Sequence, residues 1–283
     1  RSLEGQLLAG LCSRYPAAAL ARFELDPEAS LKTCYSYARA VSSLAKKDPA
    51  AAAAWVDRIV SDGPDKEKQG YGPTLLKASL IEGLLQSDEA EASRRLAACP
   101  EKERADLLSQ MHPSSEQTPA YIALLRESVP AGQVPKSLVN AIYPLLWSGS
   151  EPVSKMLDDM AASPQERLAV AEKMTEYPFG SVSYTREVRV DEVTSLHDWF
   201  ALQAPGKENE LMGQSLGKLL SGGSEDFTRI AAMVTKYDAD GSGGMLIPFL
   251  SGLPPSLSED ATPLIERIAD PAKREEIRSR FQK

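Results

Sequence analysis

The sequence is poor in the residues that usually build a β-sheet core. Only 6% of its 283 residues are aromatic. A core with so few aromatic rings must consist mainly of Leu, Ala, Ile, Val and Met, which favours helices packed on helices over a sheet rich in Val, Tyr and Phe. Apolar residues make up 42% of the chain and charged residues 25%, as is typical of a soluble globular protein.

Cysteine is also scarce. Cys12, Cys34 and Cys99 are widely spaced, and neither a C-x-x-C pair nor a Cys/His spacing typical of metal ligands occurs. The favoured interpretation is that all three are reduced thiols that pack as small apolar residues. A disulfide between Cys34 and Cys99 in an oxidising compartment is the alternative that the sequence leaves open.

The chain lacks an excess of positive charge and any long apolar run. Its net charge of −8 argues against a general nucleic-acid binder and against adhesion to an anionic membrane. No segment approaches the roughly 20 apolar residues that a membrane-spanning helix needs, so we expect no membrane insertion. A secretory signal is not visible, but the sequence begins at Arg1, and a targeting segment could have been removed. The compartment is therefore left open.

What the sequence does contain is a series of amphipathic helices. Between Leu31 and Ala45, apolar residues recur every three or four positions, which is the stripe of a helix with one buried face. The start of this helix is indicated by Asp26-Pro27-Glu28, because Asp caps free N–H groups, Pro suits the first helical position and Glu favours the positive end of the dipole.

The same start signal returns along the chain. It recurs at Asp48-Pro49, Ser163-Pro164 and Asp270-Pro271, and looser versions stand at Asp88-Glu89, Thr118-Pro119, Glu151-Pro152 and Ser224-Glu225-Asp226. Short polar breaks between the helices suit antiparallel hairpins. We therefore predict an all-α fold in which antiparallel helix hairpins stack as an irregular α-α superhelix, and no cofactor is indicated.

One segment departs from the helical pattern. Residues 181–190 alternate loosely between apolar and polar, directly after the helix stop Tyr177-Pro178-Phe179-Gly180. This pattern predicts a helical-repeat region over 1–178, a linker over 179–190 and a C-terminal helical region over 191–283. One continuous domain is the alternative.

The helix starts in the N-terminal half suggest a repeat. Asp48 follows Asp26 by 22 residues, and Asp88 follows Asp48 by 40. Residues 15–112 thus resemble the degenerate helical-repeat proteins of bacteria, which are broadly similar to TPR and HEAT arrays. The resemblance implies binding of a protein or peptide on a concave face. The TPR consensus W-x2-L-G-x2-Y is not found at a fixed period, and no binding residue can be carried over.

The most suggestive chemical motif is a short acidic loop. Asp238, Asp240 and Ser242 match positions 1, 3 and 5 of an EF-hand calcium loop, with Gly243 at the turn. Position 12, which should be a bidentate carboxylate, is Phe249. Because Pro248 precedes it, we also expect the second helix of an EF-hand to be missing. A polar turn that closes a helix is the favoured interpretation.

Two further patterns could indicate catalysis. Gly213-Gln214-Ser215-Leu216-Gly217 matches the nucleophile elbow G-x-S-x-G, but that motif needs a preceding strand, and residues 207–212 have a helical pattern. No His follows Ser215, so we expect the glycines to permit close helix packing instead. His112 and His197 have no placed nucleophile nearby in sequence.

Two functional hypotheses follow. The first is a non-enzymatic helical-repeat scaffold that binds a protein or peptide partner. The second is an all-α enzyme or ligand-binding domain whose site is assembled near His197, Trp199 and the loop 238–244. The first predicts exposed aromatic or paired polar residues along a groove, and the second predicts a buried cavity where those residues converge.

Overall fold

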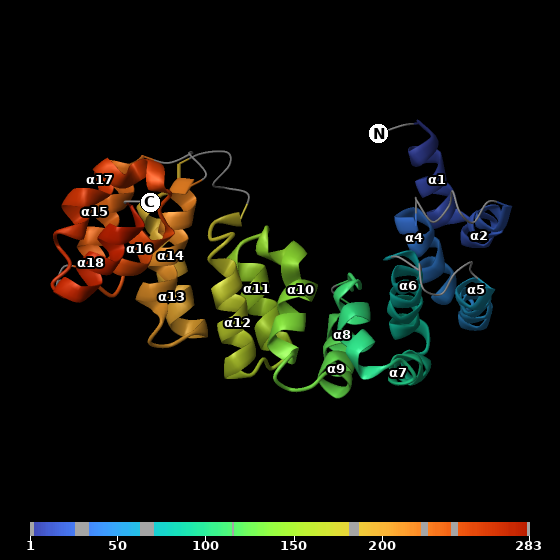
Figure 1. Cartoon of the computed structure of the whole chain (residues 1–283). Helices are drawn as coiled ribbons and strands as arrows, with labels where there is room; N and C mark the ends of the chain where they lie inside the picture. Colours follow the sequence, from blue (N-terminus) through green and yellow to red (C-terminus); the bar gives the residue numbers. More distant parts are fainter. Residues whose placement is uncertain are drawn as a thin grey trace. The chain divides into compact units, whose positions relative to one another are not determined.

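The described part of the chain is mostly helical. The computed structural model describes residues 3–25, 34–62, 71–114, 116–180, 187–221, 226–238 and 243–281. Within these ranges it contains seventeen α-helices, one short 3-10 helix and no β-strand (Figure 1). The predicted all-α class is therefore confirmed. None of the described helices combines the length and the apolar character needed to cross a membrane.

Contacts divide the chain into two units, of which the first comprises Arg1–Ala141. Its helices pack mainly around α4 and α6, which contact each other and most of their neighbours. The helices of this unit are α1 (Leu3–Arg14), α2 (Pro16–Leu25), α4 (Cys34–Ala45), α5 (Pro49–Asp62), α6 (Tyr71–Ser87), α7 (Glu89–Ala97), α8 (Glu101–Ser109) and α9 (Thr118–Ser128). The next helix, α10 (Val134–Leu146), contains the boundary between the units.

The second unit comprises Ile142–Lys283 and is centred on α14 and α16. Its helices are α11 (Ser150–Asp159), α12 (Pro164–Met174), α13 (Val190–Gln203), α14 (Glu208–Ser221), α15 (Phe227–Tyr237), α16 (Leu246–Gly252), η2 (Pro255–Leu257), α17 (Ser258–Ile265) and α18 (Pro271–Arg280). Half of the predicted linker, residues 181–186, lies outside the described residues. The division at 179–190 therefore stays a prediction.

Side-chain caps begin the helices where the sequence predicts them. Asp48 accepts a hydrogen bond from the Ala51 amide at 3.0 Å, and Asp270 accepts one from the Ala272 amide at 2.9 Å. Ser163 and Glu166 form a reciprocal capping box at the start of α12. These bonds satisfy amide groups that have no partner within the helix. Asp26, the fourth predicted cap, lies outside the described residues.

The core of the first unit contains an aromatic cluster from three helices. Phe23 of α2 is fully buried and meets Tyr37 of α4 and Trp55 of α5 edge-on, with ring centroids 5.0 Å and 5.2 Å apart. Edge-to-face rings place the positive edge of one ring against the negative face of another. The cluster ties α2, α4 and α5 together at one point.

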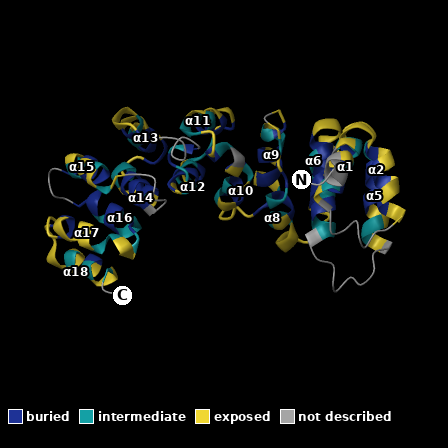
Figure 2. Cartoon of the chain, turned by 90° about the horizontal axis from the view of Figure 1, so that it is seen from above, coloured by how far each residue is buried: buried dark blue, intermediate teal, exposed yellow. Residues whose placement is uncertain are grey.

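The core of the second unit depends on close approach of α14 and α16. A Cβ on Gly217 would lie 2.5 Å from the Phe249 carbonyl oxygen, and one on Gly213 would meet the Met245 carbonyl oxygen more closely still. Gly252 of α16 faces Gly217 across the same contact. Most residues of α14 are buried, and α16 has no exposed residue (Figure 2).

One expectation about this region is wrong. Pro248 does not prevent a helix after the loop 238–244, because α16 spans Leu246–Gly252 and includes it. Pro248 occupies the first turn of α16, where an amide would lack a partner within the helix in any case. Phe249 is fully buried and packs in the core, which explains why position 12 of the supposed calcium loop is aromatic.

Candidate functional site

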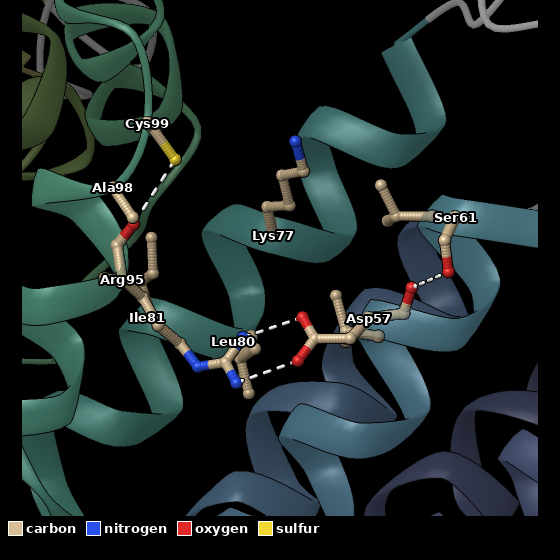
Figure 3. Close-up of a pocket in the computed structure, with 10 residues that line it drawn as sticks. Asp57, Ser61, Lys77, Leu80, Ile81, Arg95, Ala98 and Cys99 are labelled. Carbon is tan, nitrogen blue, oxygen red and sulfur yellow. Dashed lines mark hydrogen bonds and ion pairs between the residues drawn. The ribbon is translucent and has the colours of Figure 1, made fainter.

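A groove on the first unit is the best-formed candidate site. It lies between α5, α6 and α7 and encloses about 480 Å³ (Figure 3). The floor is apolar, since Val56, Leu80 and Ile81 are only 1–2% exposed. The remaining lining residues are more accessible and include Asp57, Val60, Ser61, Lys77, Arg95, Ala98 and Cys99. An apolar floor with a few polar groups above it is typical of a binding site.

An ion pair forms one wall of the groove. Arg95 of α7 donates two hydrogen bonds to Asp57 of α5, from Nη1 to Oδ1 at 2.8 Å and from Nη2 to Oδ2 at 2.9 Å (Figure 3). Its Nε donates to Glu91 at 2.7 Å. The hydrogen bonds from Arg95 lower the pKa of Asp57, and the charge of Lys77 acts weakly in the same direction. Asp57 therefore stays ionised and fully engaged at neutral pH.

Lys77 supplies the second cation of the groove. It projects from α6 and is half-buried between the walls (Figure 3). No described residue accepts a hydrogen bond from its ammonium group or forms an ion pair with it. Asp57, whose pKa the charge of Lys77 helps to lower, already uses both carboxylate oxygens on Arg95. Among the described residues, Lys77 is thus a positive charge without a matching acceptor.

Two possible nucleophiles, Cys99 and Ser61, lie among the described residues of the groove. Burial raises the pKa of the Cys99 thiol, which therefore stays protonated at neutral pH. Its Sγ donates to the Arg95 carbonyl oxygen at 3.4 Å. The Ser61 hydroxyl donates to the Asp57 carbonyl oxygen at 2.6 Å, within its own helix. Among the described groove residues, neither group is hydrogen-bonded to an imidazole or a carboxylate that could act as a general base.

Reasoning from the sequence missed every polar residue of this groove. Asp57 and Arg95 are 38 positions apart, and nothing in their local sequence predicts that they meet. For Lys77, however, the local sequence did contain an indication of a functional role. The 17-residue helix α6 contains only two charged residues, Lys77 and Glu82, on an otherwise nearly apolar sequence. A charged side chain on a mostly apolar, buried helix is costly unless it is paired or binds a ligand, so such a residue is a candidate for a binding site.

The structure gathers part of the alternative site around His197. His197 Nε2 lies 3.0 Å from Asn209 Oδ1 of α14, and the imidazole stacks on Tyr237 of α15 with ring centroids 5.0 Å apart. The Tyr237 hydroxyl in turn lies 3.0 Å from Thr194 Oγ1. Trp199 is occupied elsewhere, because its indole Nε1 donates to Ser154 of α11 at 2.6 Å. His197 thus joins three helices.

Asp238, the first residue of the supposed calcium loop, binds two backbone amides that precede α16. It is only 6% exposed, and its Oδ2 and Oδ1 accept hydrogen bonds from the Gly243 and Met245 amides at 3.0 Å and 3.3 Å. These bonds fix the chain as it enters α16. Asp240 and Ser242 lie outside the described residues, so the polar turn that the sequence favours over a calcium loop stays a prediction. Elsewhere in the described ranges, no three His, Cys, Asp or Glu side chains gather as a metal site would require.

The elbow-like motif around Ser215 is a helix-packing element. Ser215 lies inside α14, is fully buried, and donates its hydroxyl to the Leu211 carbonyl oxygen at 2.8 Å. Gly213 and Gly217 face the backbone of α16. The prediction that these glycines permit close helix packing is therefore confirmed.

Glu82, the second charged residue of α6, holds three elements together. Its Oε2 accepts a hydrogen bond from the His112 amide at 2.8 Å, and Oε1 lies 3.5 Å from the Ser42 hydroxyl of α4. Gln117 donates to the Glu82 carbonyl oxygen at 2.7 Å. Burial raises the pKa of Glu82 despite these bonds and the nearby charge of Lys46. Folding thus disfavours the ionised carboxylate of Glu82 relative to the unfolded chain.

Because the pKa of Glu82 is raised, we expect Glu82→Gln to change the stability of the protein in a pH-dependent way. When folding raises the pKa of a carboxyl, that group contributes fully to the free energy of unfolding at pH values below its pKa in the unfolded chain. The contribution is lost as the pH rises through the pKa of the group in the folded protein. We therefore expect Glu82→Gln to match the parent chain below pH 4.5 and to exceed it by up to about 1 kcal/mol at pH 7. Urea unfolding between pH 4 and 8 measures this difference.

The matched control for Glu82 is Glu127→Gln. Glu127 is exposed on α9 and undergoes the same chemical change. Its stability difference from the parent should be small. A Glu82→Gln chain that is less stable than the parent at pH 7 would contradict the prediction, because the carboxylate would then be a net stabilising group.

Comparison with known proteins yields no relative: the chain matches no protein-family model, no curated protein and no solved structure.

Proposed function

We propose that this chain is a non-enzymatic helical scaffold that binds a protein or peptide partner through the groove between α5, α6 and α7. The observation that carries the proposal is the combination of a fully buried apolar floor with a polar wall held rigid by the Asp57–Arg95 pair. Preorganised polar groups around an apolar floor reduce the entropy lost when a partner binds. The protonated Cys99 thiol and the engaged Ser61 hydroxyl favour binding over catalysis.

We further propose that the first unit is a helical-repeat array of the TPR or HEAT kind. Two of the predicted repeat starts, Asp48 and Asp88, cap α5 and α7 through the Ala51 and Glu91 amides. The groove lies between these two helices and α6. A repeat whose equivalent helices face one another across a groove supports the peptide-binding role expected of such arrays.

The competing proposal of an enzyme centred on His197 has less support. The side chain of His197 is only 18% exposed. Its described partners are Asn209, Asp198 and Tyr237, and none of these is a nucleophile that a histidine would activate. The network of His197 is adequately explained by packing between α13, α14 and α15.

Selection from a random peptide library tests the scaffold proposal. Peptides selected on the full chain should bind it in solution, as measured by fluorescence anisotropy. The variant Ser61→Trp places a bulky ring in the groove from an exposed position on α5, and we expect it to weaken binding at least about tenfold, or 1.4 kcal/mol.

The matched control is Ala50→Trp, which adds the same ring to an exposed position at the other end of α5, outside the groove. It should leave the affinity unchanged. Failure to select any peptide, or selected peptides that bind Ser61→Trp as tightly as the parent chain, would overturn the proposal.

A further inference from the structure

The Lys77 ammonium group lacks a hydrogen-bond acceptor among the described residues. It is half-buried on α6 within the groove, and no described residue accepts a hydrogen bond from it. An ammonium group that loses part of its hydration without gaining a partner is costly, and a carboxylate is the acceptor that offsets this cost best. A ligand that brings a carboxylate to Lys77 would therefore gain more than one that brings a neutral amide.

The charges around Lys77 leave it as the unmatched group. The groove lining includes two cations, Lys77 and Arg95, and one anion, Asp57. Arg95 is satisfied by Asp57 and by Glu91, and Glu91 also pairs with Arg94 at 2.8 Å. The groove thus carries a net positive charge, whereas the whole chain carries −8. This local reversal favours an anionic group at Lys77.

The floor of the groove determines the rest of the ligand. Val56, Leu80 and Ile81 present buried aliphatic side chains and leave no buried polar atom for a ligand to pair. A volume of about 480 Å³ accommodates a few aliphatic side chains. Aliphatic groups placed there would be removed from water at about 25 cal/mol per Å².

We propose that the groove recognises a peptide segment in which an acidic residue stands beside aliphatic residues. The carboxylate pairs with the Lys77 ammonium group, and the aliphatic side chains cover Val56, Leu80 and Ile81. This inference rests on the proposed peptide-binding function and adds the chemistry of the partner.

The test uses three fluorescein-labelled peptides of the same length. In the first, one glutamate is flanked by two leucines on each side, and in the others glutamine or lysine replaces the glutamate. Anisotropy titrations with the full chain should give the glutamate peptide at least about a tenfold lower Kd than the glutamine peptide, the gain typical of a charge-assisted hydrogen bond. The lysine peptide should bind more weakly than both.

Two variants of the protein test whether the preference for the glutamate peptide depends on Lys77. Lys77→Gln should bring the glutamate peptide to the affinity of the glutamine peptide. Lys47→Gln makes the same change at an exposed position on the turn after α4, outside the groove, and should leave the preference intact. Thermal melting followed by circular dichroism confirms that both variants are folded before the titrations.

The failures of the two proposals are distinguishable. Equal binding of the glutamate and glutamine peptides, or a preference that survives in Lys77→Gln, overturns the acidic partner but leaves peptide binding in place. If none of the three peptides binds, while sodium decanoate shifts the amide resonances of α5 to α7, the groove takes a small amphiphile, and both proposals fail.

Discussion

Replacement of Gly217 by alanine is expected to lower the free energy of unfolding of the second unit by about 2 kcal/mol. The added Cβ would lie 2.5 Å from the Phe249 carbonyl oxygen and 3.0 Å from the Gly252 Cα. Both are backbone atoms of α16, which cannot rotate away as a side chain can, so the two helices must separate. Overpacking of this kind costs about 1–3 kcal/mol or more, which outweighs the roughly 1 kcal/mol that alanine gains in a helix.

Hydrogen exchange in urea, followed by mass spectrometry, measures this change because peptides from each unit are observed separately. Gly10→Ala is the control. Gly10 lies in α1, and a Cβ there would meet no atom within 4 Å. It should be neutral or stabilising by up to about 1 kcal/mol. If Gly217→Ala is as stable as the parent chain, α14 and α16 do not pack as closely as described.

The second large effect is expected for Phe23→Ala. Phe23 is fully buried in α2, and its removal leaves a cavity beside Tyr37 and Trp55. Loss of a buried phenylalanine costs about 3–5 kcal/mol, because the surrounding helices relax only partly into the space. In a unit of ordinary stability this loss removes a large part of the folding free energy.

The same helix provides the control. Leu25 is 83% exposed, so Leu25→Ala should change the stability by less than about 0.5 kcal/mol. Urea unfolding followed by tryptophan fluorescence is suited to this comparison in a background in which Trp147 and Trp199 are replaced by Phe, since the Trp55 indole is in direct contact with the Phe23 ring. A Phe23→Ala chain that unfolds at the same urea concentration as Leu25→Ala would contradict the aromatic cluster.

Much of the fold could be predicted because its signals are local. A cap such as Asp48, Ser163 or Asp270 acts on amides two or three residues away, so the sequence alone contains both partners. The same holds for the helical periodicity that indicated an all-α chain. Pro248 misled because its effect depends on where the helix begins, which the tertiary packing of Phe249 helps to determine.

The candidate site could not be predicted in the same way. Its wall joins α5 to α7 through residues 38 positions apart, and its floor comes from helix faces whose orientation only the packed unit defines. The sequence instead favoured residues with distinctive chemistry, namely His197 and the acidic loop at Asp238. Of these, His197 contacts α14 and α15, and Asp238 accepts hydrogen bonds from the Gly243 and Met245 amides before α16.

The glycine contact between α14 and α16 restricts which substitutions can accumulate at these positions during evolution. Gly213, Gly217 and Gly252 each lie where a side chain would collide with backbone or meet another glycine. A substitution at one of them is harmful until the opposite helix moves, so the three positions should change together or not at all. In any set of homologous chains, we expect invariant glycine at these three positions and free drift at Gly10, where space is open.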